Sequence, residues 1–461
     1  MARPASGVVA VTALLLALQL LLQPPPASSQ AAAGVRAIAR SPFIKKIGKI
    51  IIKQVATTGG TALIKKALHS SNSGGDGDQL GGAAADNAGI ILYNVSVGQQ
   101  TFSGVVDNSN DFLWVQCPSA PAPAFSESNV PCASPTCLTA LSKTADACAD
   151  EAGPCEYVYV YGSEDEGTNS TGYLADETIT VGTGTGAPPI SGSVVFGCST
   201  ETTVNLDGAI GFSKGNLSIL SQLHISRFSY FLTPDDSNSS SSTSVVLLGD
   251  QAVPQTKHSR STPLLQSNAF PDMYYVKLTG IQVDGESLTG IPAGAFDLAA
   301  DGNSGGVALS TSIAVTWLQE DAYNAVRQSL VSKIKSEPAD SSGTDDEVFD
   351  LCYNIKSVAE LTFPKITLVF DGVDSPVMEL TTVHYFYKDT ATGLQCLTML
   401  PMPADEPIGT ILGSMLQAGT NMIYDVGGGK LMFEKGAASS VPSKVSLMWI
   451  ASLFLAWVFL F

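Results

Sequence analysis

The sequence is poor in charge and in histidine. Lys, Arg, Asp and Glu make up 14% of its 461 residues, and the 4 histidines are His69, His224, His258 and His384. So low a charge content fits neither a coiled coil nor a disordered chain, because both rely on many charged side chains. None of the histidines has a zinc-type spacing or the context of a Ser-His nucleophile, so we expect no metal and no cofactor.

Acidic residues are absent before Asp76, whereas eight Lys or Arg lie between positions 35 and 68. The rest of the chain is therefore more acidic than its formal net charge of −18 suggests. A surface of that sign repels phosphate groups, which excludes nucleic acid as a partner. The length also exceeds what a single hydrophobic core fills, so we expect two core-forming units plus extra segments.

The N-terminal end has the pattern of a secretory signal peptide over residues 1–29. Arg3 supplies the positive start, residues 8–22 form an apolar stretch, and Ala27-Ser-Ser offers a small-residue cleavage site. The apolar stretch is too short for a membrane anchor, which is the alternative. We therefore expect the chain to enter the secretory pathway.

The C-terminal end has the pattern of a glycolipid (GPI) anchor signal over residues 436–461. Small residues from Gly436 to Ser440 precede a polar spacer and an apolar run that reaches position 461. The run is shorter than the about 20 residues of a spanning helix, so a transmembrane tail is the less favoured alternative. With Gly436 as the candidate attachment residue, we expect the protein on the outer face of the plasma membrane, held there by lipid.

Residues 30–88 differ in composition from the rest. Lys45, Lys46, Lys49 and Lys53 fall on one arc of a helix opposite apolar residues, and a Gly- and Ser-rich stretch follows from position 70. We interpret this region as a basic prosegment and a flexible linker. Contact with a membrane surface and a solvated extension are the alternatives.

Secretion favours disulfides for the eight cysteines over metal or thiol chemistry. They are Cys117, Cys132, Cys137, Cys148, Cys155, Cys198, Cys352 and Cys396. The spacing alone leaves their pairing open. Four N-glycosylation sequons fit the same route, at Asn94, Asn169, Asn216 and Asn238.

From Ile90 onward, short runs of β-branched and aromatic residues alternate with turn residues, which predicts many short strands. Examples are residues 90–97, 156–161, 193–196, 245–248 and 274–283. One helix is predicted over residues 319–335, with Ala322, Tyr323, Val326, Leu330, Val331 and Ile334 on its apolar period. The pattern is that of an all-β protein with few helices.

Two segments, one in each half, have a similar build. Each has a small and apolar strand, a four-residue polar turn and an apolar run that contains a tryptophan. The first turn is Asp107-Asn-Ser-Asn before Trp114, and the second is Ser310-Thr-Ser-Ile before Trp317. The pattern suggests a duplicated unit, with two unrelated strand-turn-strand corners as the alternative.

These segments resemble the pepsin-like aspartic peptidases, and within them the plant nepenthesin-like branch, which places Asp-Thr-Gly-Ser or Asp-Ser-Gly-Thr at both turns. Further similar stretches are residues 155–162, 195–198, 226–230, 274–281, 350–354 and 410–414. The resemblance implies an all-β, bilobed fold with a central cleft, with lobes at residues 89–260 and 261–435. It also implies hydrolysis of peptide bonds by a water held between two carboxylates.

The resemblance extends to single residues. Tyr161 matches the tyrosine of the flap that covers bound substrate, and Cys352 and Cys396 resemble the pair that closes the second lobe. Phe231 stands where relatives often have cysteine, which leaves the partner of Cys198 open.

The chain departs from the family pattern at both turns. Asp107 keeps the first carboxylate, but Ser310 stands at the place of the second, and a serine hydroxyl cannot share a proton with an aspartate as the pair must. Losing one member of such a unit commonly reduces turnover by on the order of 10⁴ or more. Asp111 and Asp301 are close in sequence to the turns but are not expected to substitute.

We therefore predict a catalytically inactive, monomeric, aspartic-peptidase-like surface protein that binds or inhibits a polypeptide or cell-wall partner, similar to plant inhibitors of fungal xylanases. The alternatives are an aspartic endopeptidase with weak or non-standard activity and a structural glycoprotein.

Overall fold

The computed structural model describes residues 83–85, 91–117, 128–141, 148, 150–160, 169–182, 187–202, 207–234, 244–339, 349–389, 392–404 and 406–435. The expected signal peptide, the basic segment and the anchor signal with Gly436 lie outside these residues, as do Tyr161 and Asn238. Within the described part of the chain, no helix is long and apolar enough to cross a membrane.

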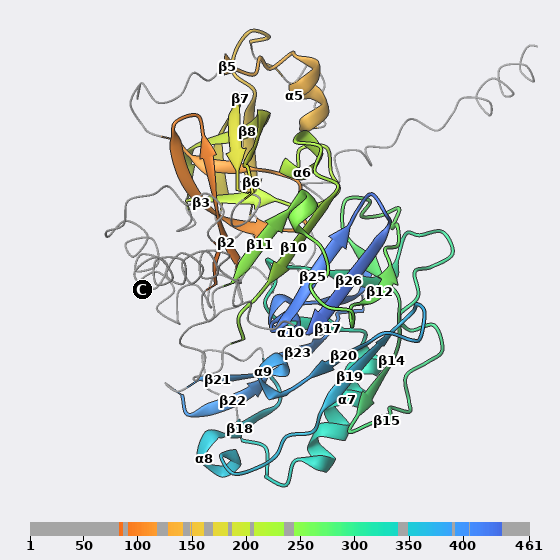
Figure 1. Ribbon diagram of the computed structural model, residues 1–461. Helices are drawn as coiled ribbons and strands as arrows, with labels where there is room; N and C mark the ends of the chain where they lie inside the picture. The colour runs from red at the N-terminus through yellow and green to blue at the C-terminus, as the bar shows by residue number, and fades with distance from the viewer. Residues whose placement is uncertain are drawn as a thin grey trace, which may run out of the picture.

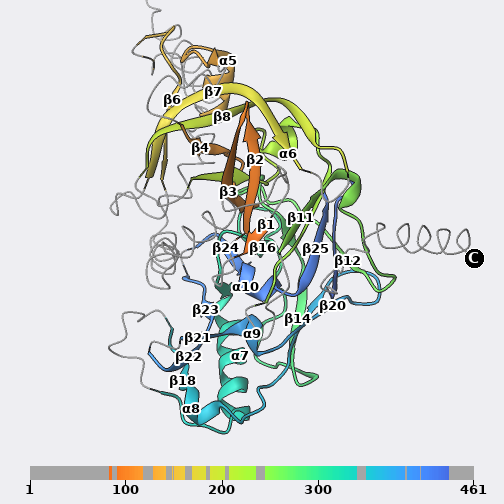
Figure 2. The same ribbon diagram turned by 60° about the vertical axis from the view of Figure 1, so that its left-hand side comes forward.

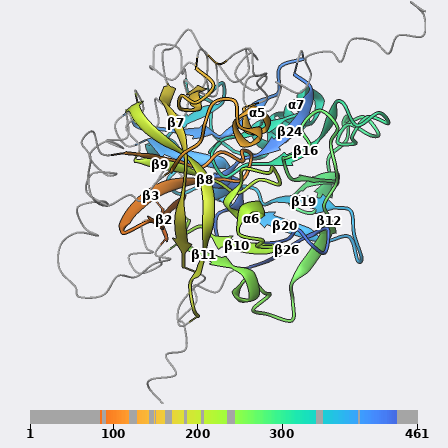
Figure 3. The same ribbon diagram turned by 90° about the horizontal axis from the view of Figure 1, so that it is seen from above.

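The first half of the chain forms one large, curved sheet. Its strands are β1 (Ala83–Ala85), β2 (Ile91–Val97), β3 (Gln100–Asp107), β4 (Trp114–Gln116), β5 (Ser128–Asn129), β6 (Glu156–Val160), β7 (Asn169–Val181), β8 (Ile190–Thr202) and β9 (Gly208–Gly211). They follow the order β1-β2-β3-β9-β4-β8-β7-β5, while β2 and β6 also pair with β7. The long strands β7 and β8 curve together over this half (Figures 2 and 3). Strand β1 falls within the stretch expected to be a linker and pairs antiparallel with β2.

A second sheet joins the two halves. It has the order β11 (Val245–Leu248), β10 (Arg227–Phe231), β25 (Thr420–Asp425), β26 (Lys430–Lys435) and β12 (Arg260–Pro263). The central pairing of β10 with β25 unites strands almost 200 residues apart, and Figure 1 shows this sheet between the upper and lower parts of the molecule. The molecule is therefore bilobed, with the halves joined by continuous strand pairing.

The second half holds three smaller sheets. One is β13 (Tyr275–Val276), β16 (Gly305–Leu309), β24 (Ile408–Leu412), β17 (Thr316–Leu318) and β23 (Met399–Pro401). Another is β15 (Glu286–Ser287), β14 (Leu278–Val283), β19 (Ile366–Phe370) and β20 (Val377–Leu380). The third is β18 (Cys352–Asn354), β22 (Leu394–Leu397) and β21 (Phe386–Asp389). All-β architecture is thus confirmed.

Helices in the described residues are short apart from α7 (Glu320–Lys333). The others are α5 (Pro135–Ala140), α6 (Ile219–Gln222), α8 (Ile355–Val358), α9 (Thr382–Tyr385), α10 (Ser414–Gln417) and the 3-10 turn η3 (Gly249–Gln251). Helix α7 lies where the sequence predicts it. Of its predicted apolar positions, Val331 is the exception, because it is 37% exposed.

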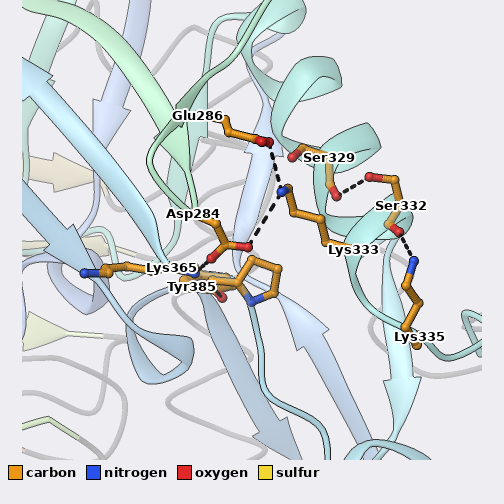
Figure 4. A network of polar contacts seen from close by, with 9 residues as sticks. Asp284, Glu286, Ser329, Ser332, Lys333, Lys335, Lys365 and Tyr385 are labelled. Atoms are coloured by element: carbon orange, nitrogen blue, oxygen red, sulfur yellow. Dashed lines mark hydrogen bonds and ion pairs between the residues drawn. The ribbon is translucent and has the colours of Figure 1, made fainter.

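The C-terminal end of α7 is tied to the β14–β15 hairpin (Figure 4). Lys333 Nζ lies 3.7 Å from an Asp284 carboxylate oxygen and 3.1 Å from one of Glu286. Asp284 has a positive φ of 52°, as a tight hairpin turn requires. These ion pairs are solvent-exposed, so we assign them a role in orienting α7 and little net stability.

Strand pairing repeats in the two halves. β3 runs parallel to β9, β9 antiparallel to β4, and β4 parallel to β8. In the same way β16 runs parallel to β24, β24 antiparallel to β17, and β17 parallel to β23. Trp114 is the first residue of β4, and Trp317 is the second residue of the equivalent strand β17. Both tryptophans are fully buried. The two segments are therefore equivalent units, as their sequence pattern suggests.

The described cysteines all form disulfides: Cys117–Cys198, Cys132–Cys148, Cys137–Cys155 and Cys352–Cys396. The pair that the resemblance implied in the second lobe is confirmed. Cys198, whose partner the sequence left open, pairs with Cys117 and connects the end of β4 to β8. Among the sequons, Asn216 is exposed in a loop, whereas Asn94 and Asn169 are partly buried in strands.

Candidate functional site

The two polar turns meet at the junction of the halves. Asp107 is the last residue of β3, and Ser310 directly follows β16. Each turn passes close to a glycine at the end of a neighbouring strand. A Cβ atom on Gly211 would lie 2.3 Å from the backbone of Asp111, and one on Gly413 would lie 2.2 Å from Val315 O. Only glycine allows these close backbone approaches.

Asn108 and Thr311 tie the turns together by reciprocal hydrogen bonds. The Asn108 N–H donates to Thr311 Oγ1 (3.1 Å), and the Thr311 N–H donates to Asn108 Oδ1 (2.9 Å). The Thr311 hydroxyl in turn donates to the Val106 carbonyl (2.8 Å). Both side chains are fully buried. The sequence placed Asn108 where the family has a hydroxyl residue, and the structure shows that its amide oxygen still links the turns.

A buried polar chain continues from Asn108 around the site. Asn108 Nδ2 donates to the Tyr424 hydroxyl (3.2 Å), which lies 3.0 Å from the Tyr230 hydroxyl. Tyr230 donates to Gln417 Oε1, and Gln417 Nε2 donates to the Ser310 carbonyl (3.0 Å). The chain leads from the first turn to the second through strands β25 and β10 and helix α10. Sequence analysis missed these three residues because their polar atoms meet only across strands that are distant in sequence.

The Asp107 carboxylate is held by donors from both turns. Its Oδ1 accepts hydrogen bonds from the Ser109 N–H (2.9 Å), the Ser109 hydroxyl (2.8 Å) and the Ser312 hydroxyl (2.9 Å). Burial raises the pKa of Asp107 above its ordinary value, and these hydrogen bonds partly offset that effect. Ser312 from the second half thus reaches the retained carboxylate, a contact that the sequence did not predict.

Three serine hydroxyls form a triangle beside this carboxylate. Ser109 Oγ lies 2.9 Å from Ser310 Oγ and 3.4 Å from Ser312 Oγ, and the last two are 3.3 Å apart. Ser310 is fully buried, and its hydroxyl accepts a hydrogen bond from the Ile313 N–H (3.2 Å). Hydroxyl groups therefore occupy the space next to Asp107 on the side of the second turn.

Neither alternative acid reaches Asp107 through a described contact. Asp111 Oδ2 accepts from the Leu217 N–H (3.3 Å), and burial raises the pKa of Asp111 to about 6, with a further increase from Asp272. Asp301 is exposed and accepts from the Asn303 N–H (3.0 Å). Among the described residues, no acidic side chain forms a hydrogen bond with Asp107, so its carboxylate has no acidic partner there.

The loop whose Leu217 N–H bonds to Asp111 also contacts the second half. The Lys214 N–H donates to the Asp272 carbonyl (2.8 Å), and Lys214 Nζ donates to Gln266 Oε1 (2.8 Å). Burial lowers the pKa of Lys214, and the nearby Asp272 opposes that shift. The loop that carries Lys214 thus joins the first half to the second beside the turns.

Tyr159 is a further residue that the sequence did not single out. Its hydroxyl accepts a hydrogen bond from Asn110 Nδ2, and its ring packs 5.7 Å from that of Phe112. Burial raises its pKa, and the negative charges of Asp107 and Asp111 raise it further. Tyr161, the predicted flap residue, lies outside the described residues. Tyrosine recurs at every second position from 157 to 161 of the sequence, and that alternation was the available signal.

Residues 211–215 read Gly-Phe-Ser-Lys-Gly, which matches the Gly-x-Ser-x-Gly motif of serine hydrolases. The motif residue Ser213 is 1% exposed, and its hydroxyl accepts from the Gly215 N–H (3.2 Å). A nucleophilic serine in that motif stands exposed at a sharp turn. The geometry therefore does not support serine catalysis at Ser213.

Comparisons with known proteins agree with this architecture. Two family models match: "Xylanase inhibitor N-terminal" over residues 92–250 and "Xylanase inhibitor C-terminal" over residues 273–435. Aspartic proteinase nepenthesin-1 of Nepenthes gracilis is 30% identical over 408 residues, which cover 84% of this chain and 86% of the relative. Nepenthesin-2 of the same plant is 33% identical and covers 73% of this chain and 75% of the relative.

Solved structures show the same fold. The crystal structure of basic 7S globulin from soybean aligns with a TM-score of 0.59 at 19% identity, covering 79% of this chain and 96% of that chain. That likeness concerns the fold alone. The two matched family models and the nepenthesin relatives show that the chain belongs to the plant pepsin-like aspartic peptidase family, in the group with xylanase-inhibitor N- and C-terminal domains.

Proposed function

We propose that this chain is a peptidase-like protein without peptidase activity that binds a polypeptide partner at the two turns. The observation that carries the proposal is the serine triangle. Ser109 and Ser312 donate to a single carboxylate, and Ser310 bonds to Ser109, at the place where the family holds two carboxylates.

The chemistry of the missing pair supports this function. In a pair of aspartates in contact, one ionised group activates water while the protonated group polarises the peptide carbonyl. Here Asp107 can act as a base when ionised, but the Ser310 hydroxyl is far too weak an acid to replace the second carboxyl. A water molecule bound beside Asp107 would therefore have no protonated carboxyl next to it to polarise the peptide carbonyl.

The scaffold around the turns supports binding. Asn108, Thr311 and Gln417 hold both turns by buried hydrogen bonds, so the loss of the second acid does not disconnect the halves. An extended polypeptide is the partner class that a bilobed sheet protein can recognise through backbone hydrogen bonds. The xylanase-inhibitor description of both family domains adds a secreted glycoside hydrolase as a specific partner to test.

Catalysis is tested with purified protein in an acid proteolysis assay on an unfolded protein substrate. We expect turnover on the order of 10⁴-fold or more below that of an active relative such as nepenthesin-1. A triple variant, Ser310→Asp with Ser109→Gly and Ser312→Gly, restores the second acid and both glycines of the family pattern and should gain activity over the wild-type chain. Efficient wild-type proteolysis that Asp107→Ala abolishes would overturn the proposal.

Binding is tested separately by titrating the protein into a xylanase activity assay and by fluorescence anisotropy with extended peptides. We expect saturable binding in at least one of these assays. The absence of both inhibition and peptide binding would favour a structural glycoprotein.

An aspartic endopeptidase of weak activity is the second candidate function, because curated relatives are named as aspartic proteinases. Retention of Asp107 is the observation that favours it. The proteolysis assay separates the two functions directly, since only an endopeptidase loses measurable turnover in Asp107→Ala.

A further inference from the structure

We propose that the polypeptide partner presents a lysine or arginine side chain to the Asp107 carboxylate. This inference rests on the proposed binding function and specifies the chemistry of the contact.

The direction of the hydrogen bonds defines what the site can accept. The hydroxyl protons of Ser109 and Ser312 both point to Asp107 Oδ1. Because Ser109 has already donated its proton, the 2.9 Å contact with Ser310 requires Ser310 to donate to Ser109. All three hydroxyl protons are therefore engaged within the site.

The remaining groups are acceptors. The hydroxyl hydrogen bonds to Asp107 both end on Oδ1, and its other donors are the backbone N–H groups of Ser109 and Asn110, so no described side chain donates to Oδ2. Asp107, Ser109 and Ser312 are partly exposed, whereas Ser310 is buried. A ligand that approaches the turns thus meets a carboxylate oxygen and hydroxyl lone pairs but no free hydroxyl donor.

The charged groups beside the first turn are two carboxylates and one ammonium, so the balance is negative. Asp111 and Asp272 add carboxylates beside the first turn, and the Lys214 ammonium is already bonded to Gln266. An anionic ligand would meet a negative balance of charge and no free hydroxyl donor at the turns. An ammonium or guanidinium group supplies the donors that Asp107 lacks and binds a carboxylate by a charge-assisted hydrogen bond.

The probes are four pools of fluorescein-labelled heptapeptides, with mixed residues at six positions and a fixed central residue. That residue is lysine, arginine, norleucine or glutamate. Norleucine keeps most of the lysine stem and removes the charge, so it isolates the contact with the carboxylate. Anisotropy titrations of the full-length secreted protein at neutral pH give an apparent Kd for each pool.

We expect the lysine and arginine pools to bind about tenfold more tightly than the norleucine pool, as a charge-assisted hydrogen bond implies. The isosteric Asp107→Asn should reduce that preference to within about twofold. Glu360→Gln, which neutralises an exposed carboxylate elsewhere, is the matched control and should retain it.

Equal binding of the lysine and norleucine pools to the wild-type protein would overturn this inference and leave polypeptide binding intact. A lysine preference that survives Asp107→Asn would also overturn it, because another group would then hold the cation. If no pool binds, the proposed function itself fails.

Discussion

Asp111→Asn should stabilise the folded protein at neutral pH. Burial raises the pKa of Asp111 to about 6 from its ordinary value of 3.8. The folded state therefore holds a proton between these pH values that the unfolded state has released. Stability must then fall as the pH rises from about 4 to about 6.

The magnitude follows from the shift. A difference of about two pKa units corresponds to roughly 3 kcal/mol of stability that the ionised side chain removes at pH 7. Asparagine keeps an oxygen that can accept from the Leu217 N–H, so little of that bond is lost. We expect Asp111→Asn to gain about 2 to 3 kcal/mol at pH 7 and close to nothing at pH 4.

Urea unfolding of both proteins, followed by tryptophan fluorescence at several pH values between 4 and 7.5, measures this difference. Glu360→Gln serves as the control for removing one exposed negative charge. The reasoning is refuted if Asp111→Asn is less stable than the wild type at pH 7, or if the difference between them does not change with pH.

Three further changes test individual contacts of the fold. Thr311→Val leaves the Asn108 N–H without its acceptor in a buried site and should cost about 2 to 4 kcal/mol in urea unfolding; a loss below 1 kcal/mol would contradict the role of this bond. Glu434→Gln replaces a buried carboxylate that accepts four hydrogen bonds and should cost about 2 to 3 kcal/mol at pH 7. Burial raises the pKa of Glu434, but these hydrogen bonds outweigh that effect, so the pKa of the carboxyl is lowered overall. The cost of the substitution should therefore shrink as the pH falls below about 4.5, and a cost that does not change with pH would contradict this reasoning. Replacing both Cys117 and Cys198 by alanine removes a disulfide with a sequence separation of 81 and should lower the free energy of unfolding by about 4 to 5 kcal/mol. Thermal unfolding of the variant and of the disulfide-bonded wild type measures this loss. Unchanged stability would contradict the pairing.

The loss of one acid is compatible with the preserved scaffold for a physical reason. Two carboxylates in contact destabilise a buried site unless they share a proton. With Ser310 in place of the second acid, the hydroxyls satisfy Asp107 by hydrogen bonds instead. The residues that connect the turns, Asn108 and Thr311, do not depend on that pair.

Local sequence determined much of the fold. The strand of residues 245–248 and helix α7 lie where periodicity predicts them, because alternating or 3.6-residue apolar patterns fix which side chains are buried. The similar patterns around Asp107 and Ser310 predicted equivalent units, and the strand pairing shows them. The replacement of an acid by Ser310 is likewise visible in the sequence alone, since no folding can give a serine a carboxyl group.

Tertiary structure decided which side chains complete the site. Tyr230, Gln417 and Tyr424 come from β10, α10 and β25, and nothing in their local sequence shows that their polar atoms meet. The same holds for Cys117 and Cys198, whose pairing depends on β4 lying beside β8. Hydrogen bonds and disulfides act over a few ångströms, so contacts between distant segments exist only once the strands have assembled.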